Sequence, residues 1–186
     1  MGQHGSFSGN PMTEWLVGEN GEDRDMRLLA DFSFVDPEGR LWLAPAGAII
    51  NGASIPRPLW SSVGSPYTDN YRRASVVHDV ACGTPGVSRK DADVMFFFAC
   101  KAGGCTSTQA RILYAGVRIG AWAATSLPSN ALSTKRYLFR EWLDTPPLEE
   151  QFLQGKLSQI TREMQMLPDD SPVDQLDNII DRHPRL

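Results

Sequence analysis

The sequence is short of cysteine and of long apolar runs, and each shortage excludes a class of protein. The three cysteines, Cys82, Cys100 and Cys105, are an odd number, which disfavours a secreted scaffold built on disulfides. We expect reduced, buried thiols, and a pair among the three stays open as an alternative. No apolar run approaches the roughly 20 residues that span a bilayer, so no transmembrane helix is expected.

Met1 to Asn10 are polar and rich in glycine, without the basic and then apolar layout of a secretory signal peptide. Export by the general secretion route is therefore not expected. We expect the protein in the cytoplasm of the producing cell, or delivered by a phage particle or a contractile secretion machine. The sequence leaves the localisation open between these.

The net charge of −4 is carried by the C-terminal tail. From Leu148 onward eight acidic residues stand against four basic ones, whereas residues 1–147 hold fourteen of each sign. No basic stripe indicates nucleic acid as a partner. Apolar residues recur at helical spacing on a polar background from Leu148 to Leu167. We expect a single globular domain over 1–147, followed by an acidic amphipathic helical arm over 148–186 that either folds back or binds a protein partner.

The N-terminal third indicates a small antiparallel sheet. Met12 to Val17 and Met26 to Val35 alternate partly between apolar and polar residues. The residues DPEG at 36–39 suit a type I turn, and Arg40 to Leu43 follow it. We therefore expect a hairpin between the second and third of these strands. The Pro- and Gly-rich stretch from Ala44 to Tyr67 is expected to be an ordered loop held by apolar anchors.

Helical spacing begins at Tyr71 and continues to Cys82, where GTPG at 83–86 ends it. SRKD at 88–91 has the spacing of a capping box before a second helix over Ala92 to Lys101. The two helices should form an antiparallel hairpin. A third helix is expected from about Ser107 to Thr125, and a fourth from Ser133 to Leu143. The predicted fold class is α+β and mainly helical.

His78 and Asp93 are expected to face each other across this hairpin. His78 lies five residues before Gly83, and Asp93 lies five residues after Ser88. Both side chains are then about 7.5 Å from the turn, at the same level. A carboxylate opposite an imidazole fixes the tautomer and raises the basicity with which the ring takes a proton from water. The alternative is a structural hydrogen bond that clamps the two helices without catalysis.

Asp79 is turned by about 100° from His78 around the same helix, so it points elsewhere. Asn51 and Gly52 lie upstream and offer amide and backbone carbonyl oxygens. Together with a carboxylate, these are the hard oxygen ligands that calcium takes. The candidate metal ligands are therefore Asp79, Asn51 and Gly52, with calcium as the ion.

Arg57 and Arg89 are candidate substrate-binding residues, because a guanidinium offers a planar pair of donors to phosphate or carboxylate. Ion pairs with neighbouring aspartates are the simpler alternative. The other histidines, His4 and His183, lie near the two ends of the chain, too few for a metal phosphohydrolase of the His-Asp type. Cys82 shares a helix stripe with His78, which favours core packing over a cysteine nucleophile.

These motifs resemble a known family. NGASIPR at 51–57, His78-Asp79, and the Ser88-Arg89 to Asp93 segment are similar to the phage-associated family called domain of unknown function 1353. The resemblance covers roughly residues 31–124. The family name implies no activity.

The same core is more loosely similar to prokaryotic secreted phospholipase A2. That resemblance implies that His78 activates water, that Asp79 binds calcium with loop carbonyls, and that Asp93 orients His78. Calcium would then polarise the ester carbonyl and hold the oxyanion. The chain departs from that family at Asn51, where the bacterial enzymes have Asp, and at Ala53, where they have Cys.

The leading hypothesis is a hydrolase with a His-Asp site that cleaves phospholipid esters with the help of calcium. Its substrate would be phospholipid or a membrane surface, and a toxin delivered into rival cells would suit such an enzyme. The competing hypothesis is a non-enzymatic, phage-derived structural or adaptor protein in which the same residues stabilise the loop.

Overall fold

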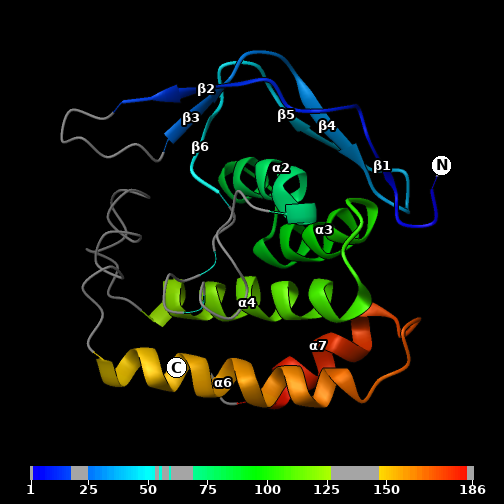
Figure 1. Cartoon of the computed structure of the whole chain (residues 1–186), viewed down its shortest axis with the longest axis vertical. Helices are drawn as coiled ribbons and strands as arrows, with labels where there is room; N and C mark the ends of the chain where they lie inside the picture. Colours follow the sequence, from blue (N-terminus) through cyan, green and yellow to red (C-terminus); the bar gives the residue numbers. More distant parts are fainter. Residues whose placement is uncertain are drawn as a thin grey trace. The chain divides into compact units, whose positions relative to one another are not determined.

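The computed structural model describes residues 2–17, 25–52, 55, 59, 69–126 and 147–183. The chain forms two compact units. The first combines Met1–Ala53 with Pro66–Thr106, and the second combines Ser54–Ser65 with Ser107–Leu186. The first unit contains the strands and two helices, and the second contains the remaining helices (Figure 1). The fold is α+β and mainly helical, as the sequence predicts.

Six short strands form two antiparallel sheets in the first unit. They are β1 (Ser6–Phe7), β2 (Thr13–Leu16), β3 (Asp25–Leu28), β4 (Phe32–Val35), β5 (Leu41–Ala44) and β6 (Ile49–Ile50). One sheet has the strand order β1-β4-β5 and the other has the order β2-β3-β6. Alternate side chains, such as those of Phe32, Phe34, Trp42 and Ala44, are buried, as expected for sheets that cover a core on one face.

The predicted turn joins β4 to β5. The backbone N–H of Asp36 donates to the carbonyl of Arg40 at 3.1 Å, and that of Gly39 donates to the carbonyl of Asp36 at 3.0 Å. Gly39 has a φ of 85°, a conformation that a residue with a Cβ adopts only under strain. The buried Asp36 carboxylate accepts the Trp42 indole N–H at 2.8 Å. Local turn chemistry therefore fixes the hairpin.

The prediction of one strand over Met26 to Val35 is wrong, because this segment forms two strands in different sheets. Residues 29–31 are all exposed and break the alternation. The Leu29 N–H donates to the carbonyl of Met12 at 2.8 Å, and the Asp31 carboxylate accepts the Ala46 N–H at 2.8 Å. The chain thus changes sheets between β3 and β4. The predicted loop after Ala44 also holds β6, which pairs with β3.

Two helices, α2 (Arg72–Gly83) and α3 (Arg89–Ala102), form the predicted hairpin. A short 3₁₀ turn, η2 (Asp69–Tyr71), precedes α2. The Ser88 hydroxyl accepts the Asp91 N–H at 3.0 Å, so the predicted N-cap of α3 is confirmed. Helix α2 packs on α3 and on strands of both sheets, and α3 contacts β1 (Figure 1). This packing buries the inner faces of both helices.

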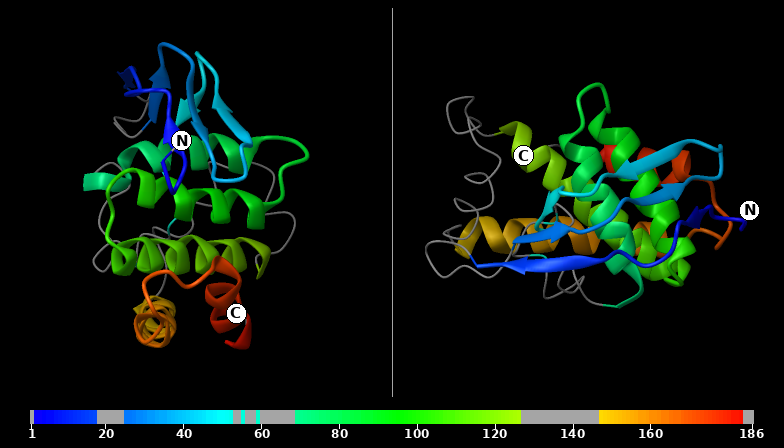
Figure 2. Two further views of the ribbon diagram at one scale, coloured as in Figure 1. Left: turned by 90° about the vertical axis from the view of Figure 1, so that its right-hand side faces the viewer. Right: turned by 90° about the horizontal axis from the view of Figure 1, so that it is seen from above.

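The second unit contains α4 (Ser107–Ser126), α6 (Pro147–Gln165) and α7 (Val173–Arg182). Helix α4 contacts both α6 and α7, and Figure 2 shows α6 and α7 side by side. The Tyr114 hydroxyl donates to Asp177 at 2.5 Å, and the Arg111 guanidinium donates to the carbonyl of Met164 at 3.0 Å. The C-terminal arm therefore folds back onto α4.

The predicted helix over Ser133 to Leu143 lies outside the described residues. None of the helices in the described part of the chain combines the length and the apolar character of a membrane span. All three cysteines are free thiols, with Cys100 and Cys105 buried and Cys82 half-buried.

Candidate functional site

The helical hairpin brings His78 and Asp93 together, as their register predicts. His78 Nε2 lies 2.8 Å from Asp93 Oδ1, a hydrogen-bond distance. Both side chains have an exposed fraction of 0%. The Phe96 ring lies 4.7 Å from the His78 ring, centre to centre, and limits its rotation. The site is therefore a fixed imidazole–carboxylate pair in a buried setting, which we call the His78–Asp93 dyad.

Arg89 adds a second cation to the Asp93 carboxylate. Its Nε lies 3.1 Å from Asp93 Oδ1, the same oxygen that His78 contacts. The two residues are one helical turn apart on α3, a spacing at which side chains meet. The Arg89 side chain is 32% exposed, whereas the carboxylate has no exposure. Its Nη2 is nevertheless buried, without a hydrogen-bond partner in the described part of the chain.

The pKa of His78 is raised by its neighbours. Burial alone would lower it, but Cys82 and the hydrogen bond and negative charge of Asp93 raise the pKa from 6.5 to about 9. At pH 7 the ring is then an imidazolium that faces a carboxylate. The ring becomes a proton acceptor only as the pH approaches 9.

Cys82 lies beside the imidazole but is not aligned with it as a nucleophile. Its Sγ is 3.5 Å from His78 Nε2 and 3.8 Å from Nδ1. The two ring nitrogens point in different directions, so a sulfur at similar distances from both lies off both N–H axes. A nucleophilic cysteine would instead share a hydrogen bond with one nitrogen of its base. This arrangement favours packing over a thiol-based reaction.

His78, Cys82 and Asp93 form the one group of three potential metal ligands among the described residues, with donor atoms within 4.8 Å of one another. Nitrogen and sulfur donors suit zinc, whereas calcium takes oxygens. His78 and Asp93 are already bonded to each other at 2.8 Å. An ion between them would have to replace that hydrogen bond.

Asp79 points away from His78, as predicted, and toward the loop that begins at Asn51. The backbone N–H of Asn51 donates to Asp79 Oδ2 at 2.7 Å. Two of the predicted calcium ligands are therefore in direct contact, and Gly52 follows in sequence. Calcium takes about six to eight oxygens. No cluster of three acidic, His or Cys side chains surrounds Asp79 in the described ranges, so these residues do not by themselves complete a calcium site.

The structure describes only one of the two predicted substrate-binding arginines. Arg57 lies outside the described residues. Arg89 contacts Asp93, which is the ion-pair alternative that the sequence left open. The catalytic, substrate-binding and metal-binding roles of all these residues stay predictions.

Sequence reasoning missed a cavity of about 630 Å³ in the first unit. It lies between the start of α2 and the segment that leads into β2, and Arg72 and Arg73 are among its lining residues. The adjacent pair of arginines is the signal that could have found it. Amphipathic spacing explains neither of them, because the apolar stripe of α2 lies on other positions.

Two uncharacterized proteins of Sinorhizobium fredii (strain NBRC 101917 / NGR234) are similar to this chain. The protein y4jT is 36% identical over 136 residues, which are 70% of this chain and 37% of y4jT. The protein y4iH is 35% identical over 102 residues, which are 55% of this chain and 43% of y4iH. The chain therefore spans less than half the length of either relative.

No solved structure matches the chain. A family model, in contrast, matches a continuous segment that contains both helices of the hairpin and the start of the loop before them. Residues 26–117, which include His78, Asp79 and Asp93, are similar to the family described as "Protein of unknown function (DUF1353)".

Proposed function

We propose that the protein is a hydrolase whose general base is His78, oriented by Asp93. The observation that carries this proposal is the 2.8 Å contact between His78 Nε2 and Asp93 Oδ1 across the hairpin. A carboxylate on one ring nitrogen fixes the tautomer that leaves the other nitrogen to accept a proton. In this arrangement Nδ1 takes a proton from a water molecule whose oxygen attacks the ester carbonyl. The imidazolium then returns that proton to the alcohol, which leaves as the ester C–O bond breaks.

Arg89 supplies the second observation. Its buried Nη2 is a hydrogen-bond donor with no partner in the described part of the chain. An unsatisfied buried donor costs about 1–3 kcal/mol, so each such group calls for a ligand or a water. A donor one helical turn from the dyad is well placed for an anionic substrate group or a developing oxyanion. This supports the predicted role of Arg89 in substrate binding.

The burial of the dyad sets a condition on the proposal, since water must reach Nδ1 before His78 acts. Burial is nevertheless compatible with catalysis. Replacing a buried ion pair by apolar residues of similar volume is often neutral or stabilising, so such a pair is weak evidence for stability. Strongly shifted pKa values also concentrate at functional sites. Catalytic geometry in a ligand-free state is often completed only when substrate binds.

Phospholipid is the proposed substrate class and calcium the proposed cofactor. Two features support them: the loop and helix motifs similar to secreted phospholipase A2, and the contact between Asn51 and Asp79. Because the described residues do not complete a calcium site, the proposed proton transfer to His78 does not involve calcium. The experiment therefore compares activity with and without calcium.

The direct test is release of fatty acid from phospholipid vesicles, and of nitrophenol from a simple nitrophenyl ester, at pH 9 with and without calcium. His78→Ala should abolish release. His183→Ala is the matched control, because His183 also contacts a carboxylate, Glu163, at 2.9 Å. It should leave release unchanged. Absence of activity toward both substrates, with and without calcium, would remove the hydrolase proposal.

A second candidate is a non-enzymatic structural or adaptor protein. The specific observation in its favour is the complete burial of both His78 and Asp93, with a second cation on the carboxylate. In that case His78→Ala and Asp93→Ala should lower the free energy of unfolding by several kcal/mol and affect no reaction. Ester release separates the two candidates, because a loss of stability in these variants is expected under both.

A further inference from the structure

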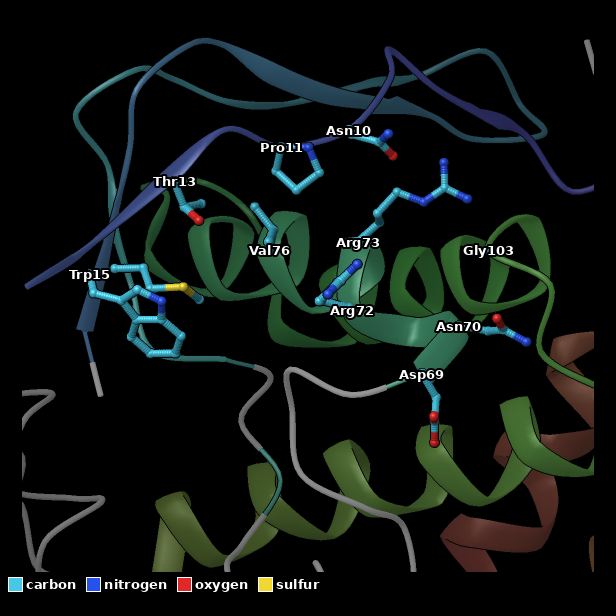
Figure 3. A pocket seen from close by; sticks show the side chains of 11 residues that line it. Asn10, Pro11, Thr13, Trp15, Asp69, Asn70, Arg72, Arg73, Val76 and Gly103 are labelled. Carbon is cyan, nitrogen blue, oxygen red and sulfur yellow. The ribbon is translucent and has the colours of Figure 1, made fainter. Parts of the chain in front are cut away.

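The cavity of about 630 Å³ lies within the size range of small-molecule sites, about 300–1,000 Å³. The residues that line it come from the segment leading into β2, from β2 and β3, from η2 and the start of α2, and from the end of α3. They include Trp15, Asp69, Asn70, Arg72, Arg73 and Gly103 (Figure 3). His78 and Asp93 are not among them, so the cavity is separate from the proposed dyad.

Two arginines that are consecutive in sequence, Arg72 and Arg73, supply the positive charge of the cavity lining. Neither Arg72 nor Arg73 forms an ion pair within the described part of the chain. The Arg73 Cζ lies 4.6 Å from the centre of the Phe7 ring, a cation–π contact that orients the guanidinium. Such a contact uses the face of the group and leaves its in-plane N–H donors available. Planar paired donors of this kind match the oxygens of a phosphate.

The wall of the cavity near η2 is tightly built. Asp69 has a φ of 55°, a left-handed conformation that residues other than glycine adopt uncommonly. The Asn70 side chain donates to the carbonyl of Gly104 at 3.0 Å. A Cβ on Gly103 would lie 2.2 Å from the Asn70 carbonyl oxygen, so only glycine fits there. These contacts hold the residues just before Arg72 and Arg73 in place.

Trp15 supplies an apolar surface at the end of the cavity away from Gly103 (Figure 3). Its side chain is 63% exposed, and it is paired in β2 and β3 with the buried Met26. A large exposed aromatic side chain in a cavity is suited to stack on a planar group. Two arginines against one aspartate leave the lining with net positive charge.

We propose that this cavity binds a phosphate monoester that carries a planar aromatic group, with the phosphate on Arg72 and Arg73 and the ring on Trp15. The inference is independent of the proposed hydrolase. A phosphate monoester carries close to two negative charges at neutral pH. It therefore matches two arginines better than a carboxylate does.

The test is isothermal titration of the full chain, at constant ionic strength, with phenyl phosphate, inorganic phosphate and benzoate. Phenyl phosphate should bind about tenfold more tightly than inorganic phosphate, since a tenfold factor lies within the range that one aromatic stacking contact contributes. It should also bind more tightly than benzoate. Equal affinity for benzoate, or no binding of phenyl phosphate at millimolar concentration, would overturn the proposal.

Substitutions test whether phenyl phosphate binds in this cavity. Arg72→Gln and Arg73→Gln should each weaken phenyl phosphate binding about tenfold, as loss of a charge-assisted contact does. Arg40→Gln is the matched control, because Arg40 also stacks on an aromatic ring, that of Trp42 at 3.9 Å, but lies outside the cavity. An equal effect of Arg40→Gln would contradict the assignment.

Two further variants probe the ends of the cavity. Trp15→Ala should remove the advantage of phenyl phosphate over inorganic phosphate and leave inorganic phosphate binding unchanged. Asp69→Asn removes a negative charge from the lining and should strengthen the binding of inorganic phosphate.

If Arg72→Gln lowers the melting temperature, Arg72→Lys keeps the charge and tests the planar geometry alone, with weaker binding expected. Unchanged affinity in Trp15→Ala and in Arg72→Lys would overturn the proposed placement.

Discussion

Two sites in this protein bring together the same three kinds of group, an imidazole, a guanidinium and a carboxylate, at nearly the same distances but in very different surroundings. In the first unit Asp93 contacts His78 at 2.8 Å and Arg89 at 3.1 Å. In the second unit Glu163 contacts His183 at 2.9 Å and Arg182 at 3.1 Å. Both sites place a histidine and an arginine on one carboxylate. The carboxylate has an exposed fraction of 0% in the first site and of 43% in the second.

This difference in burial decides what each site can do. Charges in water interact weakly because the solvent screens them, and exposed ion pairs contribute about 0–1 kcal/mol. Charges removed from water interact strongly and shift pKa values, as the raised pKa of His78 shows. The contact distances alone do not distinguish the two sites. Burial therefore makes the Asp93 site, rather than the Glu163 site, the candidate for chemistry.

The largest expected effect is the removal of each carboxylate. Asp93→Ala leaves a buried imidazolium without its partner and should lower the free energy of unfolding by about 3–5 kcal/mol. Glu163→Ala should lower it by about 1 kcal/mol or less. Urea unfolding of both variants measures these values. Equal losses would show that burial does not separate the two sites.

The pH dependence of stability is expected to differ as well. The pKa of His78 is raised to about 9, so its contribution is fully present below pH 6.5 and is lost as the pH rises through 9. A shift of this size corresponds to about 3 kcal/mol. Urea unfolding at pH 6 and pH 10 should show this loss in the wild type and in His183→Ala, but not in His78→Ala. A loss of the same size in His78→Ala would assign it to other groups.

The arginine of each site is expected to contribute less to stability than the carboxylate does. Arg89→Gln removes a charged hydrogen bond from a buried carboxylate and should cost about 1–3 kcal/mol of unfolding free energy. Arg182→Gln, on the exposed Glu163, should cost a few tenths of a kcal/mol. Chemical denaturation of the two variants in one buffer provides the measurement. A greater loss in Arg182→Gln would reverse the ranking of the two sites.

The smallest expected effect concerns Cys82. This residue raises the pKa of His78, so Cys82→Ala should move that pKa below about 9. Nuclear magnetic resonance titration of the imidazole signals follows the change, with His183 as an internal reference in the same sample. An unchanged midpoint for His78 would leave Asp93 as the cause of the raised pKa.

Local sequence rules were enough to predict the helical hairpin of α2 and α3 and the contact between His78 and Asp93 within it. The turn at Asp36 to Gly39, the cap at Ser88 and the register of His78 against Asp93 all depend on spacing along a few residues. The helix geometry converts that spacing into position, so the contact could be expected before the fold was known. The roles of these residues do not follow from the same rules.

What the sequence could not supply depends on tertiary contacts. The change of sheet after Leu28 is fixed by hydrogen bonds to Met12 and Ala46, both distant in sequence from the residues they contact. The burial of His78 depends on elements that pack from several directions. The cavity beside Arg72 and Arg73 is lined by residues of β2, β3 and α2 and by Gly103 after α3, and no single segment reveals it.

The hydrolase proposal requires His78 to act as a base once it loses its proton. The most direct measurement is the rate of ester hydrolysis from pH 6 to pH 10 for the wild type, His78→Ala and His183→Ala. We expect the wild-type rate to rise with a midpoint near pH 9, the same profile in His183→Ala, and no activity in His78→Ala. A wild-type rate that persists in His78→Ala with the same profile would contradict the claim.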